Sequence, residues 1–183
     1  MNQKIKAFEK AIQSDYSNIA AIIVHKNGTC LYKNYFHGFG AHHAFHVSSV
    51  TKSILSILIG IALDKGYITS LDQKVLDFFP DYTPKRGEKT AQRVTLRDML
   101  TMTTPFTYKV APYTKYFSSD DWVKSAFDLL GGKGELGRFR YTPLIGPDIL
   151  SGILSNVTGQ SVLGFAHENL FSPLGIHVTR DVV

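Results

Sequence analysis

The sequence predicts an α+β fold that is mostly helical, with one β-hairpin near the N-terminus. Two extended runs, over 19–25 and 30–36, meet at Asn27-Gly28, which is the strongest short signal for a hairpin. From about residue 68 onward, capping boxes and apolar positions at helical spacing recur with little strand pattern. We therefore expect a single domain over 1–183, with an α/β part over 1–66 and a mainly helical part over 67–183.

The first residues predict an amphipathic helix, because Ile5, Phe8 and Ile12 fall on one side at helical spacing. Lysines stand where a signal peptide would need its apolar run. The chain has one cysteine, Cys30, so it forms no intramolecular disulfide and requires no oxidising compartment. We therefore expect a cytoplasmic protein.

A helix is predicted over 49–65, with Ser48 as its N-cap, Lys65 in its last turn and Gly66 at its stop. Its run from Ile54 to Leu63 is apolar all round, which predicts a buried helix. The same run is too short to span a bilayer, and we expect no membrane partner.

Two side chains at the start of this helix carry the chemistry. Ser49 and Lys52 are three residues apart, which places their Cβ atoms about 5–6 Å apart on one face. A serine hydroxyl is a weak nucleophile until a base takes its proton, and a neutral lysine amine can do so. A cation in the first turn of a helix opposes the helix dipole, so helix stability does not explain a lysine at position 52. The alternative is a chance Ser-x-x-Lys spacing, which the context of a capped, apolar helix disfavours.

Five further segments carry helix signals. Ser70-Leu71-Asp72-Gln73 and Thr95-Leu96-Arg97-Asp98 are capping boxes, the first opening a short helix that Pro80 ends. Helices are also expected over 120–130, 147–158 and 161–171, with Gly159 between the last two. We expect the long segments 81–93 and 104–118 to be irregular and to form functional rims.

Composition excludes several functions. The net charge is +5, and the basic residues are scattered, so we expect no nucleic-acid partner. His37, His42, His43 and His46 lie close together, but their stretch has no Cys, Asp or Glu. Polar loop and strand residues are the simpler interpretation, and we expect neither a metal nor a cofactor.

Several segments in order resemble one family, the serine β-lactamases and penicillin-binding proteins, and within it the class C-like esterases, lactamases and D-amino-peptide hydrolases. The resemblance covers most of residues 19–176 and implies an acyl-enzyme mechanism in a cleft between an α/β part and an all-helical part. The segments that carry it are Phe45-His46-Val47-Ser48-Ser49-Val50-Thr51-Lys52-Ser53, residues 59–66 and 71–75, Phe79-Pro80, residues 94–103, Phe139-Arg140-Tyr141, residues 152–154 and 157–160, and Phe171-Ser172-Pro173-Leu174-Gly175-Ile176.

The resemblance implies a third catalytic residue, Tyr141, which falls at the tyrosine of the family's Tyr-x-Asn motif and would move protons together with Lys52. The sequence departs from that motif at Pro143, whose side chain cannot hydrogen-bond a substrate amide. This departure favours esters or an unusual substrate over typical β-lactams and peptides.

The family's third motif, Lys-Thr-Gly or His-x-Gly, has no counterpart in residues 177–183. We therefore expect a sheet that is incomplete because the C-terminal strands are absent, with weak activity in this form. Its unpaired edge would accept a second copy of the chain or a complementing chain.

Two functions stay open. The first is a serine hydrolase that acts on a small-molecule substrate, a cyclic amide, an ester or a small peptide, with Ser49 acylated and Lys52 and Tyr141 moving protons. The second is a non-catalytic binding or sensor module, or a truncated remnant. A covalent adduct that Ser49→Ala abolishes would distinguish them.

Overall fold

The computed structural model describes residues 3–110, 112–142 and 144–177. The chain forms two compact units, Met1–Val47 and Ser48–Val183. The helix that carries Ser49 and Lys52 therefore belongs to the same unit as the later helices. The division predicted after residue 66 concerns parts of one domain and stays a prediction.

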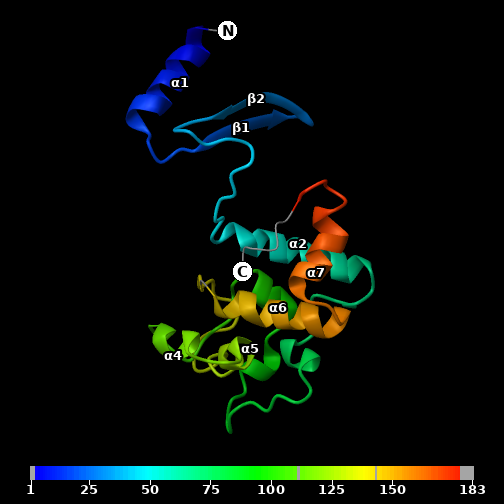
Figure 1. The fold of residues 1–183 in the computed structure, drawn as a ribbon. Helices are drawn as coiled ribbons and strands as arrows, with labels where there is room; N and C mark the ends of the chain where they lie inside the picture. The colour runs from blue at the N-terminus through cyan, green and yellow to red at the C-terminus, as the bar shows by residue number, and fades with distance from the viewer. Residues whose placement is uncertain (1–2, 111, 143, 178–183) are drawn as a thin grey trace. The chain divides into compact units, whose positions relative to one another are not determined.

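The first unit consists of one helix and one hairpin (Figure 1). Helix α1 spans Gln3–Asp15, and strands β1 (Ala21–Lys26) and β2 (Thr29–Tyr35) pair antiparallel. Asn27 and Gly28 both have positive φ, 50° and 75°, as a two-residue turn of type I′ requires. The hairpin predicted from Asn27-Gly28 is confirmed.

Helix α1 packs on the hairpin through polar and aromatic contacts. The Glu9 carboxylate accepts hydrogen bonds from the Tyr32 hydroxyl (3.0 Å) and the Asn34 amide (2.8 Å). The rings of Phe8 and Tyr32 meet edge to face with centroids 5.9 Å apart, and Ile12 is buried. The predicted amphipathic helix is confirmed, with Ile12 as its most buried side chain.

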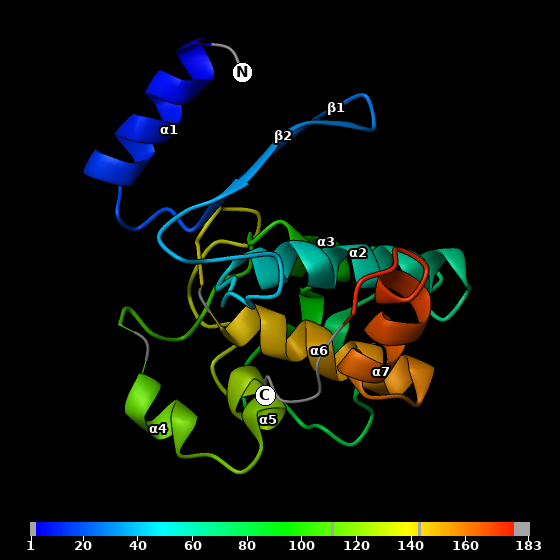
Figure 2. The ribbon, with the colours of Figure 1, turned by 45° about the horizontal axis from the view of Figure 1, so that its top comes forward.

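In the second unit, α2 (Val50–Asp64) lies beside α6 (Ile145–Thr158), as Figures 1 and 2 both show. Their facing side chains form the centre of the core and include Leu58 and Ile59 of α2 and Ile149 and Ile153 of α6, all fully buried. Burying an aliphatic side chain of this size stabilises a fold by about 1.5–3 kcal/mol. The other elements are η1 (Val75–Phe78), η2 (Ala91–Arg93), α3 (Leu96–Leu100), α4 (Tyr113–Phe117), α5 (Trp122–Phe127), α7 (Val162–Ala166) and η3 (His167–Phe171).

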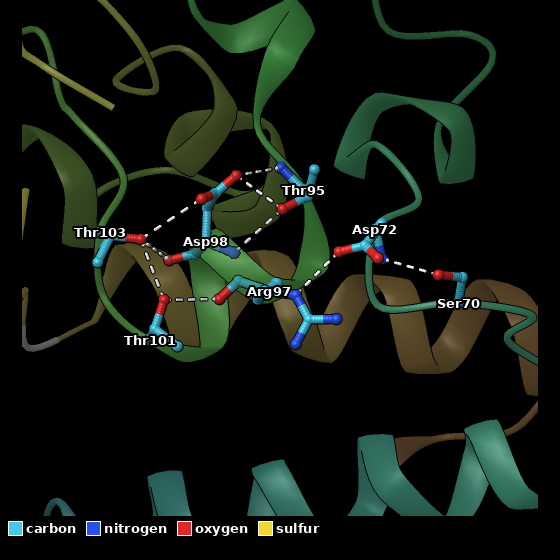
Figure 3. Close-up of polar contacts among 7 residues, drawn as sticks. All are labelled: Ser70, Asp72, Thr95, Arg97, Asp98, Thr101 and Thr103. Carbon is cyan, nitrogen blue, oxygen red and sulfur yellow. Dashed lines mark hydrogen bonds and ion pairs between the residues drawn. The ribbon is translucent and has the colours of Figure 1, made fainter. Parts of the chain in front are cut away.

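The two predicted capping boxes have different outcomes. At α3 the box is complete, because the Thr95 side chain accepts from the Asp98 N–H and the Asp98 carboxylate accepts from the Thr95 N–H (Figure 3). At residues 70–73 the predicted start of the helix is wrong, although a short helix does precede Pro80. There the Gln73 side chain accepts from the N–H groups of Thr69 and Ser70 and closes a turn, and the short helix η1 begins only at Val75.

Three other boundaries also differ from prediction. The expected irregular segment 104–118 contains α4, and the helix expected over 120–130 is only Trp122–Phe127, capped by Asp121. The helix expected over 161–171 is divided into α7 and the π-helical η3. By contrast, α6 ends as predicted at Gly159, whose φ of 68° is left-handed.

No single helix in the described part of the chain is long and apolar enough to cross a membrane. The helices over 145–158 and 162–171 meet the length and composition requirement only as a pair, bent by 75°.

Candidate active site

The site begins where the backbone enters α2. Ser48 has a positive φ of 47°, a conformation that costs a non-glycine residue about 1–3 kcal/mol. Ser49 is the N-cap of α2, so the prediction that Ser48 caps the helix is wrong. The reason is that Ser48 is left-handed, whereas Ser49 already has helical dihedrals, φ −71° and ψ −5°.

The Ser49 hydroxyl makes no capping hydrogen bond. An N-cap serine ordinarily accepts from a backbone N–H two or three residues later, and this bond stabilises a helix by about 1 kcal/mol. Here the hydroxyl instead contacts two ionisable side chains. It accepts a hydrogen bond from the Lys52 amine at 3.0 Å and lies 2.7 Å from the Tyr141 hydroxyl.

The structure therefore brings Ser49, Lys52 and Tyr141 together, although Tyr141 is 92 residues from Ser49 in sequence. The Lys52 amine also lies 5.4 Å from the centre of the Tyr141 ring, within the range of a cation–π contact. Tyr141 is 51% exposed and Ser49 is exposed, while Lys52 is half-buried. The hydroxyl and the phenol are thus reachable from solvent, and the amine lies behind them.

This arrangement lowers the pKa of Tyr141. The largest cause is the hydrogen bond with Ser49, and the hydrogen bond and positive charge of Lys52 act in the same direction, against the opposing effect of burial. A phenol in this setting gives up its proton more readily than a free tyrosine. The cluster can therefore take a proton from one group and deliver it to another.

Arg140 holds the backbone beside Tyr141 in place, a role that the sequence alone does not predict. Its N–H donates to the Met102 carbonyl at 2.8 Å, and its guanidinium donates to the Tyr108 carbonyl at 2.6 Å and to the Phe106 carbonyl at 3.4 Å. The guanidinium also lies over the Tyr108 ring, 4.9 Å from its centre. The only sequence feature that could have indicated this role is the position of Arg140 directly before Tyr141.

A small cavity of about 30 Å³ adjoins Lys52, which is the volume of about one water molecule. The side chains around it come from α2, from the end of α3 and from the start of α6: Lys52, Leu55, Ser56, Met99, Leu100, Met102, Thr142, Gly146, Pro147 and Leu150. A cavity of about 330 Å³ lies beside Arg138, Phe139 and Arg140, next to Tyr141 in sequence.

A larger cavity of about 710 Å³ is lined by residues of α5, α6 and the segment 79–83. None of the three candidate catalytic residues lines it. We place the candidate site at Ser49 rather than in this larger space, because the Ser49 hydroxyl contacts two side chains that can move its proton.

Two features of the sequence fall outside the described residues: Pro143, and residues 178–183 of the segment that lacks the third motif. Within the described ranges, no group of three or more His, Cys, Asp or Glu side chains could hold a metal ion. His42 and His43 stack on each other at 4.2 Å, and the His43 ring accepts from the Gly40 N–H.

Solved structures of similar fold include the crystal structure of a putative beta-lactamase from Bacteroides dorei, with 23% identity and a TM-score of 0.73 over 97% of this chain. EstCE1, named a hydrolase with promiscuous acyltransferase activity, gives 18% identity and a TM-score of 0.73 over 98% of the chain. The octameric penicillin-binding protein homologue from Pyrococcus abyssi gives 22% identity and a TM-score of 0.67 over 94% of the chain.

The chain spans only about half the length of these structures, covering 54%, 54% and 42% of them. A search of curated proteins gave no match. The model of one protein family, described as Beta-lactamase, matches residues 4–180, nearly the whole chain. The fold, mostly helical with a two-stranded hairpin, agrees with part of the fold of the longer relatives. This chain, whose Ser49-x-x-Lys52 segment opens helix α2, therefore belongs to the beta-lactamase family.

Proposed function

We propose that the chain is a serine hydrolase that works through an acyl-enzyme at Ser49. The observation that carries this proposal is the Ser49 hydroxyl, which leaves its capping bond unmade and instead contacts Lys52 and Tyr141 at 3.0 and 2.7 Å. A serine that acts only as an N-cap is expected to make the capping hydrogen bond. A nucleophilic serine instead needs neighbouring groups that take its proton.

The reaction has two halves. In the first, Ser49 Oγ bonds to the substrate carbonyl carbon as its proton passes to the Tyr141–Lys52 pair, and the carbonyl oxygen becomes an oxyanion. Backbone N–H groups at the start of α2 stabilise that oxyanion. The bond to the leaving group then breaks, and the leaving oxygen or nitrogen receives the proton that Ser49 gave up.

In the second half, water attacks the acyl-enzyme carbonyl and loses a proton to the same pair. The bond between Ser49 Oγ and the acyl carbon breaks, the proton returns to Ser49, and the acid is released. Each proton thus leaves and returns through Tyr141 and Lys52, so the site needs no cofactor for the transfer.

The substrate class we propose is a small ester, with cyclic amides and small peptides as the next candidates. Pro143 stands two residues after Tyr141 in the sequence, and it offers no side-chain hydrogen bond to a substrate amide. The name of EstCE1, a hydrolase with promiscuous acyltransferase activity, and that of a 6-aminohexanoate-dimer hydrolase from Bacillus anthracis both agree with acyl transfer.

The test is to incubate the purified chain separately with a chromogenic ester and a chromogenic cephalosporin, and to weigh it by intact-protein mass spectrometry. We expect an acyl adduct from the ester, located on the peptide that contains Ser49. Ser49→Ala should abolish the adduct.

Ser53→Ala is the matched control, because Ser53 is an exposed serine of the same helix outside the cluster. It should leave the adduct unchanged. An adduct that persists in a folded Ser49→Ala chain would contradict the assignment of the nucleophile. No adduct with any substrate from a chain that circular dichroism shows to be folded would favour the non-catalytic module.

A further inference from the structure

A buried threonine borders the candidate site. Thr142 directly follows Tyr141 in the sequence and is only 4% exposed. It lines the cavity of about 30 Å³ that adjoins Lys52. Its hydroxyl makes no hydrogen bond with any other residue that the structure describes, although a buried hydroxyl ordinarily has a partner. The wall of the cavity therefore carries a polar group whose hydrogen bonds are still to be made.

A glycine borders the same cavity on the side of α6. Gly146 lies in the first turn of this helix. A Cβ atom added there would lie 3.7 Å from Thr142 Oγ1 and 3.7 Å from Met99 Cε, which are ordinary van der Waals distances. An alanine at position 146 would therefore fit without displacing either group. Its methyl group would take up the space in front of the Thr142 hydroxyl.

Two further polar side chains line the cavity, and both come from α2. Lys52 and Ser56 are four residues apart, so they lie on one face of the helix. A charged lysine has three N–H donors, of which one goes to Ser49 Oγ and another to the Tyr141 hydroxyl. The Ser56 hydroxyl donates to the Ser53 carbonyl at 2.9 Å, and its lone pairs can still accept.

A single water molecule matches both the size and the polarity of this space. A site for a buried water needs about 10–15 Å³ at the least and about two to four polar partners. The cavity has about 30 Å³, and Lys52, Ser56 and Thr142 supply three polar side chains. An apolar occupant would leave the Thr142 hydroxyl unpaired.

We infer that Thr142 is a positioning residue that acts on Lys52 through one bound water molecule. The water accepts a hydrogen bond from the Lys52 amine and donates one to Thr142 Oγ1. The amine is thereby fixed on one side by the water and on the other by its 3.0 Å contact with Ser49 Oγ. The inference rests on the proposed function for its catalytic meaning, because a fixed amine speeds acylation only if Ser49 is the nucleophile.

The first experiment locates the water without any substrate, in crystal structures of the full chain. In the wild type we expect an ordered water at about 2.7–3.2 Å from both Thr142 Oγ1 and Lys52 Nζ. It should be lost in Gly146→Ala, where the methyl group takes its place, and in Thr142→Val, which keeps the shape of threonine without the hydroxyl. A wild-type structure in which no water bridges these two atoms overturns the inference.

The second experiment measures acylation by a chromogenic ester in the burst phase. Thr142→Val should slow acylation about three- to tenfold, the effect of one hydrogen bond of ordinary strength. The dissociation constant of the ester should stay the same, because Thr142 is buried behind the reacting groups. Thr142→Ser restores the hydroxyl and should restore the rate. Gly146→Ala keeps the hydroxyl and should still slow acylation, because it excludes the water.

The chain offers a matched control for each variant. Thr104 is 2% exposed, donates to Met99 Sδ at 3.3 Å and does not line this cavity, so Thr104→Val removes a buried hydroxyl elsewhere. Gly60 of α2 has no atom within 4 Å of an added Cβ, so Gly60→Ala raises helix propensity without filling a cavity. Both controls should keep the water and the wild-type rate, and thermal unfolding checks that every variant is folded.

The two readouts separate this inference from the proposed function. A chain that holds the water but forms no adduct with any ester refutes the hydrolase and leaves the water site standing. A chain that forms the adduct equally fast with and without the water refutes the positioning role of Thr142 alone. Equal losses of rate in the control and test variants would also refute that role, since they would follow from altered packing.

Discussion

Lys52 occupies the first turn of a helix, where the dipole opposes a positive charge by about 0.3–1 kcal/mol. The structure shows two contacts that offset this cost, one with Ser49 Oγ and one with the face of the Tyr141 ring. A lysine held this way is confined to one position. It is thereby available to act on Tyr141, whose pKa it lowers.

The first prediction at the residue scale concerns the pH dependence of acylation. The pKa of Tyr141 is lowered, so acylation should rise with pH through a midpoint below about 10, the usual value for tyrosine. Removing the amine in Lys52→Ala removes a cause of that lowering, so the midpoint should move up while the rate below it falls by about 10²–10⁴. Burst kinetics with a chromogenic ester over a range of pH measures both.

Lys65→Ala is the control, because Lys65 is an exposed lysine at the opposite end of the same helix. Its profile should overlay that of the wild type. A midpoint that stays constant or moves down in Lys52→Ala would show that the amine does not favour the phenolate.

Only some residues of the candidate site could be predicted from the sequence. Ser49 and Lys52 were predictable as a pair, because three-residue spacing on a helix fixes their proximity. Tyr141 lies 92 residues away, and no local rule connects it to Ser49, so its assignment came from resemblance alone. The hydrogen bond between Tyr116 of α4 and Asp148 of α6 was not predicted either, since neither spacing nor composition indicates that these two helices meet.

At the scale of elements, the network around α3 ties together three stretches of chain. Asp98 accepts from the N–H and the hydroxyl of Thr95, at 2.9 and 2.7 Å, and Thr103 contacts the same carboxylate from the other end of the helix (Figure 3). Arg97 pairs with Asp72 at 2.8 Å. Because Met99 of α3 lines the cavity beside Lys52, this network supports one wall of that cavity.

The second prediction tests the cap of α3. Thr95→Ala should lower the free energy of unfolding by about 1 kcal/mol, because the Asp98 N–H loses its acceptor. Thr95→Ser keeps the hydroxyl and should lose much less. Urea unfolding measures the difference, and equal losses in the two variants would mean that the hydroxyl does not stabilise the helix.

Elements with strong local signals were predictable. Asn27-Gly28 defined the hairpin, and Thr95 with Asp98 defined the start of α3, since both signals act within four residues. At residues 70–73 the same kind of box closes a turn. The chain there first pairs at Lys74 with Thr95, a contact between distant segments, and the short helix η1 begins only after this contact. The short α4 was missed because proline, lysine and tyrosine dominate the segment around it.

At the scale of the whole molecule, residues 36–49 connect the two compact units without helix or strand. Phe39 and Phe45 in this stretch are 40% and 47% exposed. Proteases act first on exposed segments that lack regular structure.

The third prediction is that brief chymotrypsin digestion cuts the folded chain after Phe39 or Phe45 before it cuts elsewhere. Mass spectrometry should then find a fragment that begins at Gly40 or His46 and contains all of the later helices. A chain with serine at both phenylalanine positions should resist this first cut. Initial cleavage within α6 would contradict the division into these units.

The sheet of the first unit is small. Among the described residues it contains only β1 and β2, and the chain covers 54% of the Bacteroides dorei structure. The prediction that its edge pairs with a second copy or a complementing chain remains a prediction.

One consequence follows from the membership of Ser49, Lys52 and Tyr141 in a single unit, Ser48–Val183. The contacts that join these three side chains all lie within that unit. A hybrid that carries the leading segment of a relative before Ser48 should therefore retain the contacts among Ser49, Lys52 and Tyr141. Recombination at this junction would change the first unit, Met1–Val47, and leave the second unit, Ser48–Val183, unchanged.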